Sequence, residues 1–317
     1  MNAPLLEGLF TSENEAMQAV LEHAARAGER PETPIRIVGE VGAGKEVLAR
    51  FIHVRTPVRG TGPFVRVACA GIGGEVLESE LFGRDGGALG ALEQASGGTL
   101  FLEDVGELPA RLQLEFLRIL KTHRFRRLGG GADLPFDARI VIATSVDLAK
   151  AARQGLFRPE LFHRLDVVRL LLPPLRQRRE DVLPLARWFL LQLSRQWARA
   201  PQELSEEAER KLLAYDYPGN VRELRNMMES AVIATPDGRI DAASLPLAIF
   251  ASPDDVFFAI HLAAGEPAPT MAEVEKRYLE RVLRFARGNR SEVARVLGLS
   301  YPTVTRKIAE YGLKVPG

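Results

Sequence analysis

Cysteine is almost absent from this chain, since Cys69 is the single one among 317 residues. One cysteine excludes an internal disulfide framework and a tetrahedral cysteine cluster for zinc, and it is typical of a reducing compartment. The N-terminus has no basic segment followed by an apolar one, and the longest apolar stretches, such as 167–172, are far shorter than a membrane span. We therefore expect a cytoplasmic protein that is neither exported nor inserted into a membrane.

The chain also has no overall excess of one charge, because 42 Lys and Arg residues nearly balance 41 Asp and Glu residues. The distribution is uneven: residues 270–317 carry a local charge of +5, which leaves −4 for the other 269 residues. A compact basic segment favours a polyanionic partner, although a solvated helical face has the same composition. The length and the 46% hydrophobic content predict a globular protein of two or three domains.

Short apolar segments alternate with helical patterns in the first half of the chain. The β-rich segments are Ile35–Val38, Phe64–Cys69, Thr99–Leu102 and Arg139–Thr144, and a helical pattern such as 110–123 lies between them. This alternation predicts an α/β fold with a mainly parallel sheet, covered by helices on both faces. After Pro173-Pro174 only helical patterns follow, at 180–197, 205–214 and 220–233.

These patterns divide the chain into four parts. We predict an α/β subdomain over residues 1–175 and a helical subdomain over residues 176–249. Residues 250–269 collect proline, aspartate and glycine, which predicts a linker. Residues 270–317 then form a separate all-α unit.

A glycine-rich turn, Gly39-Glu40-Val41-Gly42-Ala43-Gly44-Lys45, lies between the first strand and a helix and satisfies the pattern G-x-x-x-x-G-K. We call residues 39–45 the phosphate loop. Its backbone N–H groups can converge on phosphate oxygens, and its lysine can reach the outer phosphates. The pattern therefore predicts a loop that binds ATP, rather than a flexible turn without a ligand. The candidate nucleotide contacts are Gly39, Glu40, Gly42, Ala43, Gly44, Lys45 and Glu46, the last of which stands where the general pattern has a magnesium-binding Ser or Thr.

Two carboxylates, Glu103 and Asp104, end the apolar strand that lies 58 residues after Lys45. Carboxylates in this position can hold Mg²⁺ and polarise water beside a nucleotide. An acidic turn is common in isolation, but the phosphate loop favours the functional interpretation. Both residues are therefore candidate catalytic residues and candidate Mg²⁺ ligands, and the role of each stays open.

Several motifs, taken in order, resemble the AAA+ central domain of bacterial enhancer-binding proteins, the activators of sigma-54 RNA polymerase. They are the phosphate loop followed by Glu46, then Glu80-Leu81-Phe82-Gly83, Gly98-Thr99-Leu100-Phe101-Leu102, Gly106-Glu107-Leu108-Pro109, the segment 157–165 and Pro218-Gly219-Asn220-Val221-Arg222-Glu223-Leu224. The resemblance implies an AAA+ P-loop NTPase fold in which a glutamate after the lysine is usual. It also implies that Arg158 and Arg164 are catalytic arginine fingers that reach a neighbouring subunit's nucleotide, and that Arg222 senses the γ-phosphate in cis. The expected partner is a second copy of the chain, in a dimer or a hexamer-type ring.

Residues 288–300 followed by 301–311 resemble the Fis-type helix-turn-helix that ends these activators. Val293, Ala294, Leu297, Val304 and Ile308 have the spacing to pack two helices together. The residues left to contact bases and phosphates are Ser300, Tyr301, Thr303, Arg306 and Lys307. Double-stranded DNA is the expected partner, with a generic helical hairpin as the alternative, and RNA polymerase is a further candidate partner.

The chain departs from the family where function is concerned. The family has a long loop bearing GAFTGA, which touches sigma-54, where this chain has only the thirteen residues Arg84 to Ser96. Family members without this motif act without sigma-54. The family's Asp-Glu pair is here Glu103-Asp104, its switch asparagine is Ala68, and its sensor asparagine is Ser145, which is also a candidate nucleotide contact.

These departures predict a regulator that binds ATP, hydrolyses it weakly or not at all, and acts without sigma-54. The alternative is a functional sigma-54-dependent activator whose ATPase remodels the polymerase holoenzyme. No receiver domain is expected before Leu6, so control by phosphorylation in cis is not expected either.

Overall fold

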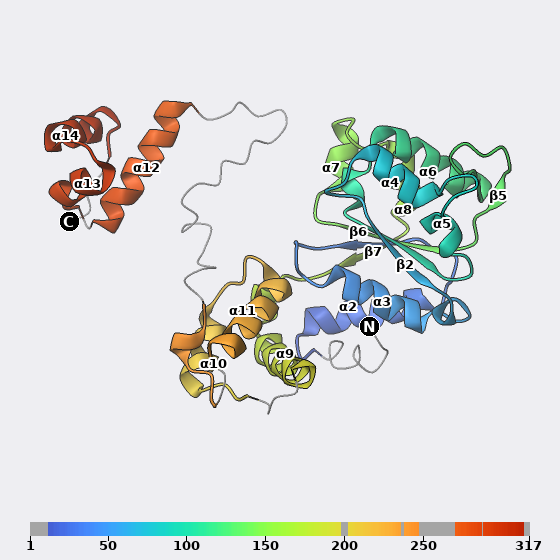
Figure 1. Ribbon diagram of the computed structural model, residues 1–317, viewed down its shortest axis with the longest axis horizontal. Coiled ribbons are helices and arrows are strands. Elements are labelled where there is room, and N and C mark those ends of the chain that lie inside the picture. The colour runs from blue at the N-terminus through green and yellow to red at the C-terminus, as the bar shows by residue number, and fades with distance from the viewer. Residues whose placement is uncertain (1–11, 198–201, 236–237, 247–269, 287, 314–317) are drawn as a thin grey trace. The chain divides into compact units, whose positions relative to one another are not determined.

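The computed structural model describes residues 12–197, 202–235, 238–246, 270–286 and 288–313. The chain divides into two units between residues 252 and 253. The first unit combines a sheet with a helical subdomain, and the second is all helical (Figure 1). The linker predicted over residues 250–269 lies outside the described residues. No helix in the described ranges is long and apolar enough to cross a membrane.

Five parallel strands form the central sheet in the order β2-β3-β6-β1-β7. Their bounds are β1 Ile35–Val38, β2 Phe64–Ala68, β3 Thr99–Glu103, β6 Arg139–Thr144 and β7 Val168–Leu171. The first four confirm the strands predicted from the sequence. We did not predict β7, because a short apolar run shows no periodicity that separates strand from helix. The antiparallel pair β4 Arg124–Phe125 and β5 Leu134–Pro135 was also missed, since two residues carry no periodic signal.

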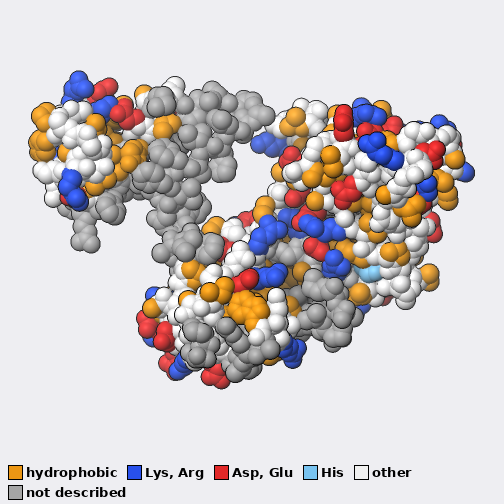
Figure 2. Space-filling view, viewed as in Figure 1, with side chains coloured by type: hydrophobic (Ala, Val, Ile, Leu, Met, Phe, Trp, Pro, Cys, Tyr) orange, Lys and Arg blue, Asp and Glu red, His pale blue; other side chains and the backbone are white. Residues whose placement is uncertain are grey.

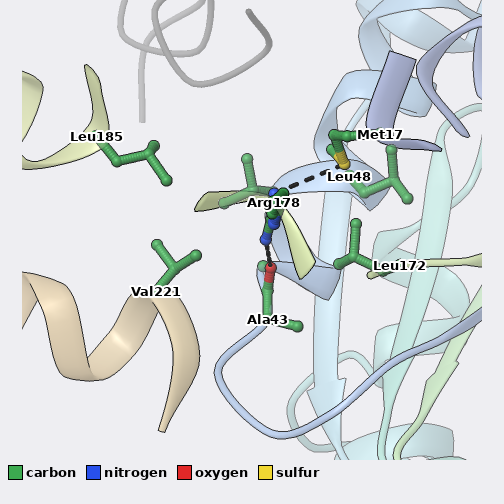
Figure 3. A pocket seen from close by; sticks show the side chains of 9 residues that line it. Met17, Ala43, Leu48, Leu172, Arg178, Leu185 and Val221 are labelled. Carbon is green, nitrogen blue, oxygen red and sulfur yellow. Dashed lines mark hydrogen bonds between the residues drawn. The ribbon is translucent and has the colours of Figure 1, made fainter. Parts of the chain in front are cut away.

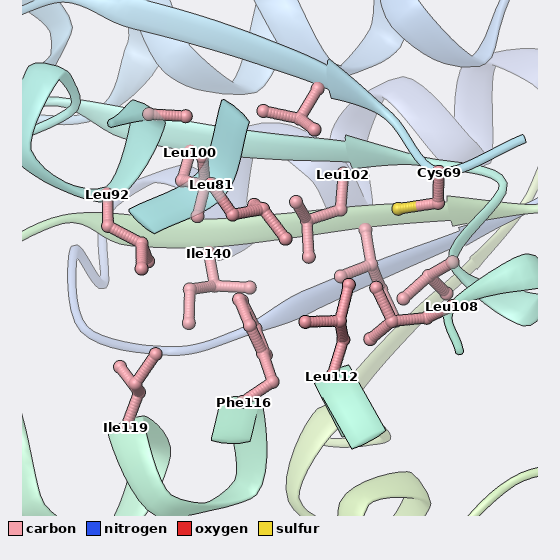
Figure 4. Packing of buried hydrophobic residues seen from close by; sticks show 14 of the residues in the cluster. Cys69, Leu81, Leu92, Leu100, Leu102, Leu108, Leu112, Phe116, Ile119 and Ile140 are labelled. Atoms are coloured by element: carbon pink, nitrogen blue, oxygen red, sulfur yellow. The ribbon is translucent and has the colours of Figure 1, made fainter. Parts of the chain in front are cut away.

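Helices cover both faces of the sheet, as predicted (Figure 1). One face carries α2 Glu15–Gly28 and α3 Lys45–Arg55. The other carries α4 Gly74–Phe82, α5 Ala91–Gln94, α6 Ala110–Thr122, α7 Leu148–Arg153 and α8 Pro159–Leu165. Because successive side chains of a strand point to opposite faces, Leu100 and Leu102 pack in the core beneath α6 (Figure 4), whereas Phe101 packs in the core beneath α3.

Cys69 belongs to the core on the α6 side (Figure 4), where its side chain is buried. Burial raises the pKa of the Cys69 thiol to about 12. The thiol therefore stays protonated at neutral pH and acts as a small apolar side chain rather than a nucleophile.

The helical subdomain consists of α9 Val182–Gln196, α10 Glu206–Ala214 and α11 Asn220–Ala234, and it has a core of its own. Ser205 caps α10 by accepting a hydrogen bond from the backbone N of Ala208 at 3.2 Å, as its position before two glutamates predicted. The subdomain follows directly on β7, so its first residues lie beside the carboxyl end of the sheet.

The C-terminal unit contains α12 Met271–Phe285, α13 Arg290–Leu297 and α14 Tyr301–Glu310. Gly298 ends α13 with a left-handed φ of 63°, which glycine adopts without steric strain. The predicted packing is confirmed: Val293, Ala294, Val304 and Ile308 are buried in one cluster, and Leu297 packs against it.

Candidate functional site

The phosphate loop connects the end of β1 to the start of α3 and places its backbone around an open turn. Gly42 and Gly44 have left-handed φ values of 76° and 106°, which residues with a Cβ rarely adopt. A Cβ at Gly42 would also lie 2.2 Å from the carbonyl oxygen of Gly219 in the helical subdomain. The loop therefore needs glycine at this position both for its turn and for its close contact with the helical subdomain.

Lys45 is the first residue of α3, and its ammonium lies over the phosphate loop. Its Nζ donates to the carbonyl oxygens of Gly39 at 2.9 Å and Glu40 at 3.0 Å. Burial lowers the pKa of Lys45, while the carboxylates of Asp104 and Glu103 act in the opposite direction. The lysine is thus positioned between the loop and the acidic end of β3, where the outer phosphates of a nucleotide would lie.

Asn220 joins the helical subdomain to the phosphate loop. Its side chain is fully buried, and its Nδ2 donates to Glu40 Oε2 at 3.0 Å and to the carbonyl oxygen of Val41 at 3.1 Å. Its Oδ1 accepts a hydrogen bond from the backbone N of Leu175 at 2.8 Å. One asparagine therefore fixes the loop, the start of the subdomain and the start of α11 relative to one another.

Two arginines reinforce this contact. Arg176 donates from Nη1 to Glu40 Oε2 at 2.8 Å, and this interaction holds the pKa of Glu40 below its ordinary value. Arg178 donates from Nη2 to the carbonyl oxygen of Ala43 at 2.7 Å. Figure 2 shows Lys and Arg side chains gathered where the helical subdomain meets the sheet.

The expected sensor, Arg222, lies on α11 beside the phosphate loop. Its side chain is exposed, and its backbone N donates to the carbonyl oxygen of Gly42 at 3.3 Å. Arg222 was predicted from the sequence as a nucleotide contact, whereas Arg176, Arg178 and Asn220 were not. A signal was present for Asn220, which belongs to the same motif as Arg222, and both arginines lie within four residues after Pro174.

An apolar cavity lies between α2, the phosphate loop and the helical subdomain (Figure 3). Its lining includes Met17, Leu48 and Leu172 from the sheet subdomain, and Leu185 and Val221 from the helical subdomain. Apolar walls next to a phosphate-binding turn suit the flat base of a nucleotide. No pattern in the sequence indicates this cavity, because its lining comes from five separate segments.

The acidic end of β3 separates its two carboxylates. Asp104 lines a cavity of about 170 Å³ together with Thr144 and Ser145, and its Oδ1 is buried without a hydrogen-bond partner. Such an unpaired carboxylate oxygen fits a cation or an activated water. Glu103 instead forms an ion pair with Arg66 of β2. The described residues contain no cluster of three or more His, Cys, Asp and Glu side chains, so a metal here would also need ligands from the nucleotide.

The two expected arginine fingers do not join this group. Arg164 lines a cavity of about 450 Å³ with Pro34 and Val167, which precede β1 and β7. It therefore lies at the amino end of the sheet, whereas the phosphate loop follows the carboxyl end of β1. The two ends of this four-residue strand are about 13 Å apart. Arg158 precedes α8, and its backbone N donates to Gln113 Oε1 of α6 at 2.8 Å. A role for either arginine in a neighbouring subunit stays a prediction.

The second helix of the C-terminal pair presents a partly exposed polar surface. Tyr301 is 50% exposed and Arg306 is exposed, while Thr303 is half-buried. Ser300 caps α14 by accepting a hydrogen bond from the backbone N of Thr303 at 3.3 Å. These four residues lie along the first two turns of one helix and the residue before it, which is the part of a recognition helix that meets base edges.

Lys307 differs from the expectation that it is free to contact DNA. Its Nζ lies 2.6 Å from Glu275 Oε1 of α12, and its side chain is only 19% exposed. Position 307 faces α12 because it lies three residues after buried Val304 and one before buried Ile308. Lys307 therefore forms an ion pair within the unit, and its contact with DNA stays a prediction.

Comparison with known proteins gives three consecutive family matches. Residues 10–171 match the Sigma-54 interaction domain, residues 176–256 match the AAA+ ATPase lid domain, and residues 270–311 match the bacterial regulatory protein, Fis family. The chain belongs to the sigma-54 interaction domain family. It is a transcriptional regulator with an AAA+ fold, a helical lid and a Fis-type helix-turn-helix, as the sequence predicted.

Relatives of the sigma-54 interaction family match nearly the whole chain. The transcriptional regulatory protein FlbD of Caulobacter vibrioides is 37% identical over 95% of this chain and 70% of its own length. The sigma54-dependent transcriptional activator SfnR of Pseudomonas putida is 38% identical over 94% of this chain and 87% of its own length. The crystal structure of NtrX from Brucella abortus in complex with ATP matches with a TM-score of 0.70 at 34% identity, over 96% of this chain and 69% of that one. Nucleotide binding by this AAA+ domain accords with that structure and with a second one in complex with ADP.

Proposed function

We propose that this family member is a sequence-specific DNA-binding transcription regulator whose AAA+ domain binds ATP, and that it acts without opening sigma-54 promoters. Weak or absent ATP hydrolysis is part of the proposal. The observation that carries it is the turn between Gly83 and Gly90, at the place where the family has its GAFTGA loop.

This turn is closed and tethered. The backbone N of Gly87 donates to the carbonyl oxygen of Arg84 at 3.0 Å, and Arg84 N donates to Ala88 O at 3.3 Å. A Cβ on Gly83 would lie 2.5 Å from the backbone N of Gly90, so the two ends of the turn are in direct contact.

The segment between β4 and β5 also bonds to this turn. Leu128 N donates to Gly83 O and Asp85 N donates to Leu128 O, each at 3.0 Å. Force from a subunit interface has to reach the polymerase through a projecting loop, and a turn bonded to itself and to its neighbour has no length left to project. This geometry supports the sigma-54-independent function.

The catalytic end of β3 supports weak hydrolysis. Asp104 stands in a left-handed conformation, with φ at 53°, which aspartate tolerates better than most residues. Its carboxylate is one methylene shorter than the glutamate of the family pair, and a displacement of about 1 Å can reduce catalysis about a hundredfold. Glu103, the other carboxylate, is bonded to Arg66. Ser145, at the sensor position, lines the same cavity as Asp104.

The nucleotide would be bound by groups that this chain supplies. The N–H groups of the phosphate loop and the ammonium of Lys45 would bind the phosphates, and the apolar cavity beside Met17 and Val221 would hold the base. Mg²⁺, when bound, would neutralise phosphate charge, with Asp104 as its protein ligand. Arg222 would contact the γ-phosphate from the same chain, and Arg158 or Arg164 from a neighbouring subunit of a homo-oligomer.

Calorimetry with a non-hydrolysable ATP analogue tests the nucleotide site. We expect the wild-type chain to bind and Lys45→Ala to lose binding, because the Lys45 ammonium lies over the loop, where the outer phosphates would be. Arg187→Ala, on the exposed face of α9, is the matched control and should bind as wild type does. Equal binding by the wild type and Lys45→Ala would contradict this site.

Reconstituted transcription tests the function. With sigma-54 polymerase, ATP and a template that carries the chain's own binding site, we expect no ATP-dependent open complexes. Open complexes would favour the second candidate function, a sigma-54-dependent activator. The observation in favour of that candidate is the 38% identity with SfnR, which is named as such an activator.

A further inference from the structure

Arg66 contacts two carboxylates that come from different elements of the nucleotide site. It lies in β2, and it donates to Glu103 Oε2 at the end of β3 from Nε at 2.8 Å and also from Nη2. The same Nε lies 3.5 Å from Glu46 Oε2 on α3. One guanidinium therefore bridges the acidic strand end and the helix that follows the phosphate loop.

The two carboxylates occupy the positions that serve Mg²⁺ in phosphate-loop proteins. Glu46 directly follows Lys45, where the general pattern places the magnesium-binding hydroxyl, and Glu103 is the first carboxylate at the strand end. Asp104, the remaining carboxylate, has an unpaired buried oxygen. One of these three carboxylates thus has an oxygen without a partner, and the other two already share the Arg66 guanidinium.

The ion pair between Arg66 and Glu103 is partly buried. The Glu103 side chain is 16% exposed and the Arg66 side chain is 46% exposed, so the carboxylate lies largely out of water while the guanidinium stays hydrated on one side. The hydrogen bond to Glu103 is the largest cause of the raised pKa of Arg66. A guanidinium does not lose its proton in proteins, so the positive charge is present at every physiological pH.

Glu46 is shared with a second arginine. Arg50 lies one turn further along α3, its Nη2 is 2.8 Å from Glu46 Oε1, and its guanidinium lies over the Phe64 ring. Glu46 therefore keeps a positive partner when Arg66 is removed, whereas Glu103 has no other ion pair among the described residues. Removal of Arg66 would free Glu103 in particular.

We infer that Arg66 is an internal cation that takes the place of Mg²⁺ on Glu103, so that ATP binds this chain with little dependence on Mg²⁺. The inference rests on the ATP site proposed above. Arg66 acts as a positioning residue: it holds Glu103 turned toward β2, and a divalent cation has to displace a guanidinium before it gains this second carboxylate.

Calorimetry on the full chain tests the inference, with a non-hydrolysable ATP analogue in EDTA and in a series of MgCl₂ concentrations. We expect added Mg²⁺ to change the dissociation constant of the wild type for the ATP analogue by less than about threefold. Added Mg²⁺ should lower that of Arg66→Ala by about tenfold or more, because the freed Glu103 carboxylate gives Mg²⁺ a further oxygen ligand. Arg66→Lys keeps the charge and should stay near the wild type. Arg187→Ala removes a comparable exposed ion pair in the helical subdomain and is the matched control.

The same Mg²⁺ dependence in the wild type and in Arg66→Ala would overturn the inference, as would a wild type that already depends strongly on Mg²⁺. Paramagnetic resonance of Mn²⁺ added to the nucleotide-free chain gives a second measurement, in which Arg66→Ala should bind Mn²⁺ more tightly than the wild type. Equal Mn²⁺ binding would also overturn it. Failure of every variant to bind the ATP analogue would instead contradict the proposed ATP site, and the Mn²⁺ titration would still decide the role of Arg66.

Discussion

Replacing Asn220 by alanine removes the side chain that joins the helical subdomain to the phosphate loop. The substitution deletes three hydrogen bonds, to Leu175 N, Glu40 Oε2 and Val41 O. Asn220 also has a left-handed φ of 54°, which asparagine tolerates better than alanine. We expect Asn220→Ala to destabilise the helical subdomain and to loosen its contact with the loop.

The magnitude follows from what each partner loses. Leu175 is fully buried, so its N–H group would be left without a partner, at about 1–3 kcal/mol. The left-handed backbone adds about 1 kcal/mol for alanine. Glu40 and Val41 are exposed enough to regain hydrogen bonds from water and should contribute little. Together these terms predict a loss of about 2–4 kcal/mol in the free energy of unfolding.

Urea denaturation followed by tryptophan fluorescence measures the free energy of unfolding of the helical subdomain. The chain has two tryptophans, Trp188 and Trp197, and both pack against the core of the helical subdomain. Asn226→Ala is the matched control on the exposed face of the same helix, and it should change the free energy of unfolding by less than about 0.5 kcal/mol. If Asn220→Ala were as stable as this control, the hydrogen bonds of Asn220 would not hold the two subdomains together.

Two further predictions concern the helix-turn-helix and the sheet core. Arg306→Ala should weaken DNA binding and flatten the plot of log affinity against log salt concentration by about 0.9, the value for one lost phosphate contact. Lys307→Ala should instead lower the stability of the C-terminal unit, because it breaks the ion pair with Glu275, and should leave the salt slope unchanged. Equal salt slopes for the two variants would contradict these roles. His53 is buried, its Nδ1 lies 2.9 Å from Thr99 Oγ1, and burial lowers its pKa. Because the unfolded chain binds a proton at a pH where folded His53 does not, the free energy of unfolding should fall as the pH drops below about 6.5. In urea denaturation, His53→Gln should remove part of that fall. An identical pH profile for the variant and the wild type would refute this role of His53.

The sequence by itself determined the elements and the chemistry at their ends. Strand alternation, the glycine spacing of the phosphate loop and the carboxylates after Thr99–Leu102 are local patterns, and four strands, the main helices and the helix-turn-helix packing followed from them. Ser205 could be predicted as a cap because its interaction spans three residues. The shortened segment after Gly83 was also visible in the sequence, although its closure into a bonded turn was not.

Tertiary structure alone decided which charged groups pair between different helices and strands. Glu40 meets Arg176 across 136 residues and Asn220 across 180, and no local period encodes such contacts. The sequence shows the charge of Lys307 but not its direction, and the packing of α12 places its ammonium against Glu275. The pairing of Glu103 with Arg66 arises in the same way: sheet order places β2 beside β3, and only that neighbourhood determines which carboxylate is bonded and which is left free.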